Sequence, residues 1–421
     1  MRNPCLIIIL FKLAFTLNAQ EQYDLQRCLE TGLERNYEIR IIRNEERISS
    51  NNVTWGNAGF LPSLNLNAAH AGTDNSHETT AGLNIEWTVF DGLQMQTNYK
   101  RLKQFHSIGE FNTQIAIENL LANLTAEYYN HVNQNLRLAN LKYAVSLSKE
   151  RMRIAAEKYY IGSESRLDML QARVDFNADS SSLLKQYEVV QTSAINLNRM
   201  MAVDNVSQKI TVTDSVIMLN PTLSGDELRK AMHHANSTLL LAAINRKVSE
   251  LDLRALKGRN YPYLKLNAGY GYTLNTNISD TPKQQDRGFT YGFTLGFNIF
   301  DGLNRQREQK NAAITSENRQ LQYKQTEQSL DADLSSMLTA YRNNLDLIRL
   351  ETENLQSARE NYEIAIDRYR LGTLAGIELR EAQNSLLNAE ERLLQAQFST
   401  KLCEISLMQI SGQVSAYIVA H

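Results

Sequence analysis

Proline is scarce in this chain of 421 residues. The sequence contains five, at Pro4, Pro62, Pro221, Pro262 and Pro282. Because proline lacks a backbone N–H and its ring clashes with the preceding turn, it breaks the interior of helices. Residues 63–220 and 283–421 contain none, so the sequence permits very long helices there.

An excess of one charge and long apolar runs are lacking too. The formal net charge is −2, which supplies no basic field for phosphate backbones, so we expect no nucleic-acid partner. Beyond residue 19 there is no run of about 18 apolar residues, so the sequence predicts no membrane-spanning helix. If the chain crosses a membrane, we expect it to do so as strands.

Motifs for catalysis and for metal binding are absent as well. There is no Gly-x-x-x-x-Gly-Lys loop, no Gly-x-Ser-x-Gly turn and no His-Glu-x-x-His. Adjacent helix positions point to different faces, so we interpret His233 and His234 as surface residues. Cys28 and Cys403 form no metal spacing, and a disulfide between them stays open. We therefore expect no enzyme, no cofactor and no metal.

The N-terminus has the composition of a secretory signal peptide. Arg2 supplies the positive charge, residues 6–17 form an apolar stretch, and residues 17–19 form a small-residue cleavage site. We predict a signal peptide over residues 1–19 and a mature chain from Gln20; a short buried strand is the alternative.

The rest of the chain is written twice. Phe90-Asp91-Gly92-Leu93 recurs as Phe300-Asp301-Gly302-Leu303, and Lys158-Tyr159-Tyr160-Ile161-Gly162 recurs at the same offset as Arg368-Tyr369-Arg370-Leu371-Gly372. A third match, residues 61–68 with residues 261–268, has a slightly smaller offset. A longer loop around residues 280–286 absorbs the difference. Such self-similarity predicts two copies of one structural unit.

Each copy contains two segments with the period of a strand. Apolar residues alternate with small or polar ones along residues 264–274, 289–299 and 83–89. A soluble β-sandwich also alternates, but it needs about seven strands and the sequence offers four. Alternating strands of about 10 residues are typical of outer-membrane barrels, which have at least about 8 strands. Four strands cannot close such a barrel, so we expect several copies to assemble.

Each copy also contains a helix too long for a globule. Residues 93–161 and 303–371 have no proline and, apart from Gly109, no glycine. As single helices they would be roughly 100 Å long. Apolar residues at steps of three and four along residues 330–369 predict coiled-coil packing against other helices.

These signals predict a mixed, mostly helical fold with an internal repeat. The first structural repeat covers residues 20–205, with helices at 23–60, 93–161 and 163–201 and strands within 62–90. A linker follows at 206–224. The second repeat covers residues 225–421, with helices at 225–259, 303–371 and 377–410 and strands within 262–299.

The duplicated motifs resemble those of the TolC-like outer-membrane efflux proteins, across essentially the whole mature chain. The resemblance rests on the repeated Phe-Asp-Gly-Leu and on the repeated Tyr-x-x-Gly with a carboxylate six residues later. It implies a homotrimer with a 12-stranded transmembrane β-barrel in the outer membrane of a Gram-negative bacterium and a helical coiled-coil barrel across the periplasm. It also implies a periplasmic adaptor (membrane fusion) protein and, through it, an inner-membrane RND or ABC pump as partners.

The resemblance assigns the second motif to the periplasmic tip. The turns Ile161-Gly162-Ser163 and Leu371-Gly372-Thr373 would contact the adaptor, although a glycine that ends a helix is also an ordinary C-cap. Glu378 and Glu381, with Asp168 of the first copy, would narrow the tunnel and favour cations; a solvated helix face is the alternative. Arg166, Arg368 and Tyr369 would latch a closed tip.

The first motif has a structural role. Gly92 and Gly302 lie where a strand turns into a helix and unrestricted φ is useful. Asp91 and Asp301 precede them and can accept hydrogen bonds from the first amides of the helix.

The predicted function is a passive export channel of a tripartite efflux or type I secretion system, in contact with outer-membrane lipid. A soluble periplasmic coiled-coil scaffold is the alternative. The exported substrate, and whether it is a drug or a polypeptide, does not follow from the sequence.

Overall fold

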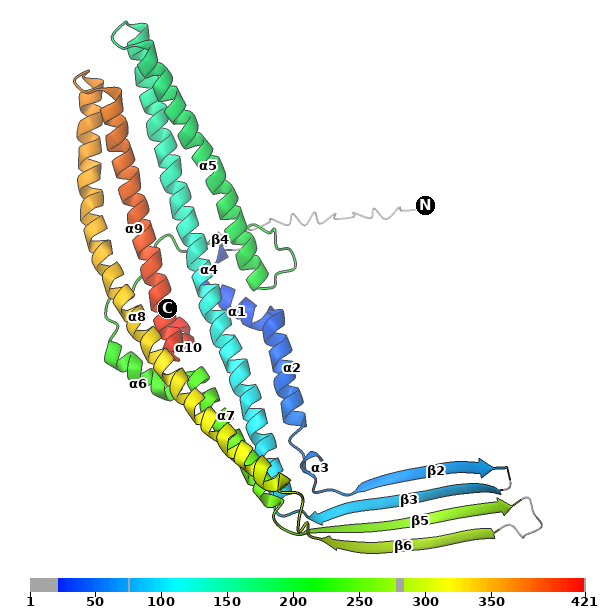
Figure 1. The fold of residues 1–421 in the computed structure, drawn as a ribbon. Helices are drawn as coiled ribbons and strands as arrows, with labels where there is room; N and C mark the ends of the chain where they lie inside the picture. Colours follow the sequence, from blue (N-terminus) through cyan, green and yellow to red (C-terminus); the bar gives the residue numbers. More distant parts are fainter. Residues whose placement is uncertain (1–21, 75, 278–283, 420–421) are drawn as a thin grey trace, which may run out of the picture. The chain divides into compact units, whose positions relative to one another are not determined.

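A computed structural model describes residues 22–74, 76–277 and 284–419 (Figure 1). The expected signal peptide lies outside the described residues. The chain divides into two compact units. The first contains the described residues up to Arg35, residues 124–219 and residues 344–401; the second contains residues 36–123, 220–343 and the remainder from residue 402. Each unit therefore takes segments from both halves of the sequence repeat.

The first unit is built from helices that lie side by side. They are α1 (Leu25–Arg35), the last part of α4 (Gln94–Tyr160), α5 (Arg166–Met200), the last part of α8 (Asn304–Arg370) and most of α9 (Gly376–Ile410). A two-residue strand β1 (Gln22–Tyr23) pairs in parallel with β4 (Thr211–Val212). α4 and α8 are each 67 residues long. The two rods expected at 93–161 and 303–371 are thus continuous helices.

One end of the first unit has its own apolar core. Ile154 of α4, Tyr362 and Tyr369 of α8, and Leu379 and Leu386 of α9 are buried together there. This core fixes the ends of the long helices against α9, so the turns beyond them are held in place.

The second unit combines helices with an antiparallel sheet. Its helices are α2 (Tyr37–Asn51), α3 (Trp55–Ala58), α6 (Gly225–Ala235), α7 (Ser237–Gly258), α10 (Val414–Val419) and the first parts of α4 and α8. Its strands are β2 (Ser63–Thr73), β3 (Ser76–Phe90), β5 (Tyr263–Asn277) and β6 (Gln284–Gly296). The strand order is β2-β3-β5-β6, and all three pairs are antiparallel. Among the described residues β2 and β6 are each paired on one side only.

The two faces of this sheet differ in chemistry. Residues opposite one another in an antiparallel sheet share a face. One row across the four strands is Leu66, Leu83, Tyr270 and Phe289, all exposed. A neighbouring row on the other face is Asn67, Gly82, Gly271 and Gly288. One face is therefore apolar and the other is small and polar.

Each leading helix is broken at an asparagine, and the first is broken a second time at residues 52–54, before α3. Segments 23–60 and 225–259, expected as single helices, are interrupted at Asn36 and at Asn236. The Asn36 side chain accepts hydrogen bonds from the amides of Glu38 and Ile39, and Asn236 accepts one from Leu239. A side chain that caps a new helix ends the old one, because its own backbone leaves the helical region. The interruption occurs at equivalent places of both repeats.

None of the helices in the described part of the chain has both the length and the apolar composition that a membrane-spanning helix needs. Cys28 and Cys403 are both free thiols. Burial raises the pKa of the Cys28 thiol to about 12, so it stays protonated.

A buried histidine makes the first unit sensitive to acid. His131 of α4 lies 2.7 Å from the Ser193 hydroxyl, and burial lowers its pKa from 6.5 to about 4. The unfolded chain takes up a proton below about pH 6.5 while the folded chain does not, so stability falls as the pH drops toward 4. We expect a loss of about 2 kcal/mol between neutral pH and about pH 5 from this group.

Thermal unfolding of the wild type and of His131→Gln at about pH 7.5 and about pH 5 measures this contribution. The variant has no imidazole to protonate, so its midpoint should fall less on acidification. Equal falls in the two proteins would contradict the assignment.

Candidate functional site

Two matching turns close the end of the first unit that contains the apolar core. In the turn after α4, the amides of Gly162 and Ser163 donate to the carbonyls of Tyr159 and Lys158, at 3.0 and 2.9 Å. Gly162 has φ 79°. This double closure is the Schellman arrangement, which needs a left-handed residue after the last helical turn.

The turn after α8 repeats this geometry. Gly372 and Thr373 donate to Tyr369 and Arg368, at 3.1 and 2.9 Å, and Gly372 has φ 77°. Ile161 and Leu371 are each 79% exposed. A Cβ at either glycine would meet no atom within 4 Å. The turns predicted to contact an adaptor thus present apolar side chains on an open surface.

A compact cluster of polar side chains, the tip cluster, joins the α4–α5 hairpin to the α8–α9 hairpin next to these turns. Lys158 Nζ donates to the Tyr369 carbonyl at 2.7 Å and lies 3.9 Å from the centroid of the Tyr369 ring. Glu164 is the third member of the tip cluster. Its carboxylate accepts a hydrogen bond from the Tyr369 hydroxyl at 3.2 Å and lies 3.7 Å from Lys158 Nζ. Burial, with the nearby Glu164 charge, raises the pKa of Tyr369 above its usual range. Tyr369 therefore remains a neutral hydrogen-bond donor.

The tip cluster shares one of its three residues with the expected latch. Tyr369 is part of it, whereas Arg166 and Arg368 are exposed and form no ion pair within the described residues. Lys158 and Glu164 take their places. The sequence indicates that charged residues lie near the turns, but it does not indicate which of their side chains point into the interior of the unit.

The three predicted constriction carboxylates have different surroundings. Asp168 accepts from the Ser165 hydroxyl at 2.6 Å, while its amide donates to that hydroxyl, so the two residues cap α5. Glu378 accepts from the Ala375 amide at 3.0 Å and caps α9. Glu381 is exposed and has no such partner among the described residues. Two carboxylates are thus tied to helix starts, and Glu381 is left with an unshared charge.

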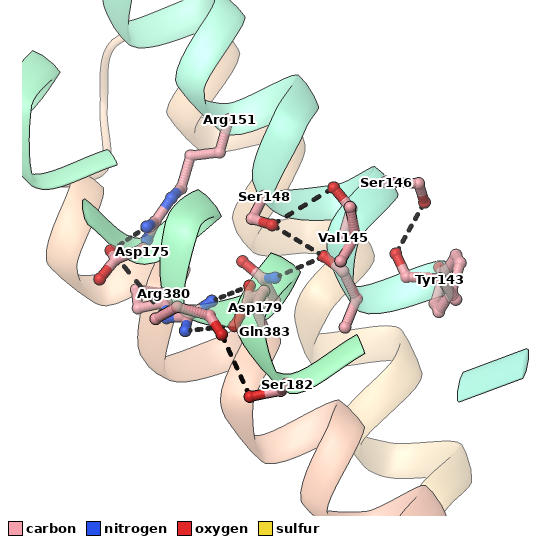
Figure 2. Close-up of polar contacts among 12 residues, drawn as sticks. Tyr143, Val145, Ser146, Ser148, Arg151, Asp175, Asp179, Ser182, Arg380 and Gln383 are labelled. Carbon is pink, nitrogen blue, oxygen red and sulfur yellow. Dashed lines mark hydrogen bonds and ion pairs between the residues drawn. The ribbon is translucent and has the colours of Figure 1, made fainter. Parts of the chain in front are cut away.

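A charged cluster joins three helices deeper in the unit (Figure 2). The Arg380 guanidinium of α9 binds the Asp179 carboxylate of α5 through two hydrogen bonds, 2.8 and 2.9 Å long. Its Nε lies 4.0 Å from Asp175, one turn earlier on α5. Asp175 also pairs with Arg151 of α4. Two arginines and two aspartates therefore neutralise one another across α4, α5 and α9.

The cluster is largely removed from solvent. The side chains of Arg151, Asp175, Asp179 and Arg380 are 4%, 15%, 13% and 20% exposed. The hydrogen bonds to Asp179 raise the pKa of Arg380, against the opposing effect of burial. Planar, bidentate pairs of this kind fix the relative orientation of both partners. Beside it, the Gln383 amide lies 3.4 Å from the Ala144 carbonyl, a further link between α9 and α4.

The strand-to-helix junctions belong to the second unit. Gly92 and Gly302 have φ 74° and 69°, and the leucines that follow them, Leu93 and Leu303, also have positive φ. Asp91 accepts from the Met95 amide at 3.1 Å, and Asp301 accepts from the Arg305 amide at 3.0 Å. Two successive left-handed residues turn the chain from the strand into the helix, and the aspartate then satisfies an amide at the start of the helix.

The described residues contain no group of three or more His, Cys, Asp or Glu side chains arranged to hold a metal ion.

Comparison with known proteins identifies the family to which this chain belongs. Residues 29–203 and 229–413 each match the family model described as outer membrane efflux protein. The chain belongs to the outer membrane efflux protein family. It is accordingly an outer-membrane efflux channel of the TolC type with a large periplasmic helical part. The two matched segments lie within the two repeats predicted from the sequence. The family assignment also decides against the soluble scaffold.

Relatives of this family resemble the chain over most of its length. The outer membrane protein TolC of Vibrio cholerae is 21% identical over an alignment 389 residues long, which covers 86% of this chain and 84% of that protein. The outer membrane protein VceC of Vibrio cholerae has a similar fold, with a TM-score of 0.79 at 15% identity, over 92% of this chain and 96% of VceC. The CmeC outer membrane channel of Campylobacter jejuni also has a TM-score of 0.79, at 17% identity, over 94% of this chain and 88% of CmeC.

Members of this family are channels and not enzymes. They function as trimers with adaptor proteins and inner-membrane pumps.

Proposed function

We propose that three copies of this chain form one export duct of a tripartite efflux or type I secretion system, without enzyme activity of its own. The observation that carries this proposal is the sheet of the second unit. Its edge strands β2 and β6 each have one unpaired side among the described residues, and its apolar face is exposed. Unpaired backbone groups are costly in lipid, so these edges need further strands. Identical copies supply them, and three copies close a 12-stranded barrel.

The two repeats have equivalent roles in this assembly. We assign residues 20–205 and 225–421 to the repeats and residues 206–224 to the linker. Each repeat provides one strand hairpin and one long helical hairpin, so that three chains contribute six of each.

The turns of the first unit form the periplasmic entrance in this proposal. Their exposed Ile161 and Leu371 offer apolar contacts to a periplasmic adaptor, which an RND or ABC pump of the inner membrane would use to open the duct. Glu381, whose charge is unshared, would face the pathway and attract cations. Asp168 and Glu378 contribute less, because each is engaged at a helix start.

Single-channel recording in planar bilayers tests the entrance. Glu381→Gln should lower the preference for cations, or raise conductance by relaxing repulsion across the ring, by roughly two- to threefold. The matched control is Glu353→Gln, an exposed carboxylate on α8 about five turns from its end, which should leave both values unchanged. If Glu381→Gln also changes neither, the entrance lies elsewhere.

The assembly is tested separately by the mass of the purified protein in detergent. A trimer is expected. A folded single chain that is stable in detergent would overturn the proposal, because its sheet edges would then have no partner.

A further inference from the structure

The apolar face of the sheet changes character toward its hairpin ends. Beyond the row of Leu66, Leu83, Tyr270 and Phe289, the rows on the same face become increasingly polar. The next rows are Ala68, Ala81, Tyr272 and Arg287, then His70, Thr79, Leu274 and Gln285, then Gly72, His77 and Thr276. Basic and aromatic side chains thus gather at one end of a face that is otherwise apolar.

These side chains are held in defined positions. The rings of His70 and His77 stack with their centroids 5.8 Å apart and their planes at 13°. His70 Nδ1 lies 2.9 Å from the Thr79 hydroxyl. The Arg287 guanidinium lies over the Tyr272 ring, 5.5 Å from its centroid. Within the described residues Arg287 has no carboxylate partner, so its charge is available to a ligand.

Charge is segregated between the two faces at this level. Neighbouring residues of a strand point to opposite faces. Glu78 and His77 therefore lie on opposite faces of the sheet, and so do Asp286 and Arg287. The acidic groups share a face with the glycine row, and the basic groups share a face with the leucines and aromatic residues. In the proposed barrel, on which this step rests, the apolar face lies against the lipid, so its basic end is also directed toward the membrane and away from the interior of the barrel.

The length of the apolar rows places this end at the surface of the bilayer. From Leu264 to Tyr272 along β5 the strand covers about 27 Å, or about 20 Å across the membrane at the usual strand tilt. The apolar band of an outer-membrane barrel is about 25 Å tall. The row of Arg287 therefore lies within about 5 Å of the margin, which its long side chain can reach. His70 and His77, one and two rows further along the sheet, lie at or just beyond it. An arginine costs about 2–4 kcal/mol at the midplane but little near the interface.

The hairpin ends lie at the end of the sheet opposite the helices of the same unit (Figure 1). Since the helical part is periplasmic, this margin is the outer one. We propose that His70, His77, Tyr272 and Arg287 form a rim that binds the phosphate groups of anionic glycolipid in the outer leaflet. The Arg287 fork binds two phosphate oxygens, and the imidazoles donate further hydrogen bonds. Tyr272 holds the guanidinium at the level of the headgroups.

Reconstitution into vesicles tests the rim. The vesicles are phosphatidylcholine mixed either with lipid A that carries two phosphates or with the same lipid after removal of its phosphates. The protein is then extracted in mild detergent, and the retained lipid is counted by mass spectrometry. We expect the phosphorylated lipid to be retained in preference, and Arg287→Gln to weaken its retention roughly tenfold. The double variant His70→Gln with His77→Gln should weaken it less.

Lys265→Gln is the matched control. Lys265 is a basic residue of the same sheet whose register with Thr88 and Thr294 places it on the opposite face, so its removal should leave lipid retention unchanged. Equal losses for Arg287→Gln and Lys265→Gln, or equal retention of the two lipids by the wild type, would overturn the proposal. Displacement of the lipid by inorganic phosphate at equal concentration would also overturn it, since the site would then be one for free anions.

This test is independent of the channel function. Single-channel conductance of Arg287→Gln in neutral phosphatidylcholine should equal that of the wild type. A normal duct with lost lipid retention therefore supports the rim alone.

Discussion

Arg380→Glu is expected to lower the free energy of unfolding by about 2–3 kcal/mol. The substitution removes the two hydrogen bonds to Asp179 and places a third carboxylate beside Asp175 and Asp179. Breaking a fully buried ion pair costs about 3–5 kcal/mol; Arg380 keeps 20% of its side chain exposed, so we expect a smaller value. Denaturant unfolding followed by circular dichroism measures the loss.

Two further variants identify the cause. Arg392, also on α9, pairs with Glu351 but is 50% exposed, so Arg392→Glu should cost less than about 1 kcal/mol. Exchanging the charges, Arg380→Asp with Asp179→Arg, should recover part of the loss because the attraction is restored. Equal losses at Arg380 and Arg392 would show that the buried cluster stabilises the unit no more than an exposed pair does.

Gly92→Ala is expected to destabilise the second unit by about 3 kcal/mol or more. Gly92 has φ 74°, and a left-handed alanine costs about 1–2 kcal/mol. In addition, the new Cβ would lie 2.1 Å from the Gly258 carbonyl oxygen, a backbone atom. The backbone must then move, which adds a cost typical of overpacking, about 1–3 kcal/mol.

The repeat supplies the control for this prediction. Gly302 occupies the equivalent junction with φ 69°, but the nearest atom to a Cβ there is the Asn304 side-chain nitrogen at 3.6 Å. Gly302→Ala should therefore cost only the backbone strain, about 1–2 kcal/mol. The thermal midpoints of the two variants measure the difference. If both midpoints fall equally, the contact with Gly258 does not destabilise the Gly92→Ala variant.

Much of the fold could be predicted from the sequence because its signals are local. Long stretches without proline, in which Gly109 is the one glycine, end at Gly162 and Gly372, and the corresponding helices end two residues earlier, at Tyr160 and Arg370. Alternation of apolar and polar residues placed the strands, and the duplicated motifs indicated that both halves repeat one plan. These features depend on residues a few positions apart, whose periodicity can be counted.

Three local signals indicate helix breaks and caps that apolar periodicity does not show. Asparagine is a preferred helix N-cap, so Asn36 and Asn236 at equivalent positions indicate the breaks in the leading helices. Ser165 followed three residues later by Asp168 is the pattern of a capping box. These patterns predict interruptions and caps, so a carboxylate near a helix start can have a capping role as well as a charge.

The inner contacts could not be predicted from sequence order. Arg380 meets Asp175 and Asp179, and Lys158 meets Tyr369, across more than two hundred positions of chain. Which of several arginines points inward depends on the rotation of each helix about its axis, and that is set by packing. Arg166 and Arg368 are the arginines predicted for the latch, whereas the inner contacts are made by Arg380 and Lys158.

The alternating direction of the four strands has a consequence for stoichiometry. β2 and β5 run one way and β3 and β6 the other, so in the proposed assembly β6 of one subunit would meet β2 of the next as an ordinary antiparallel pair. Any number of subunits can join in this manner without a mismatched seam. The hydrogen-bond ladder alone therefore does not determine how many subunits close the ring, so other contacts between subunits have to set that number.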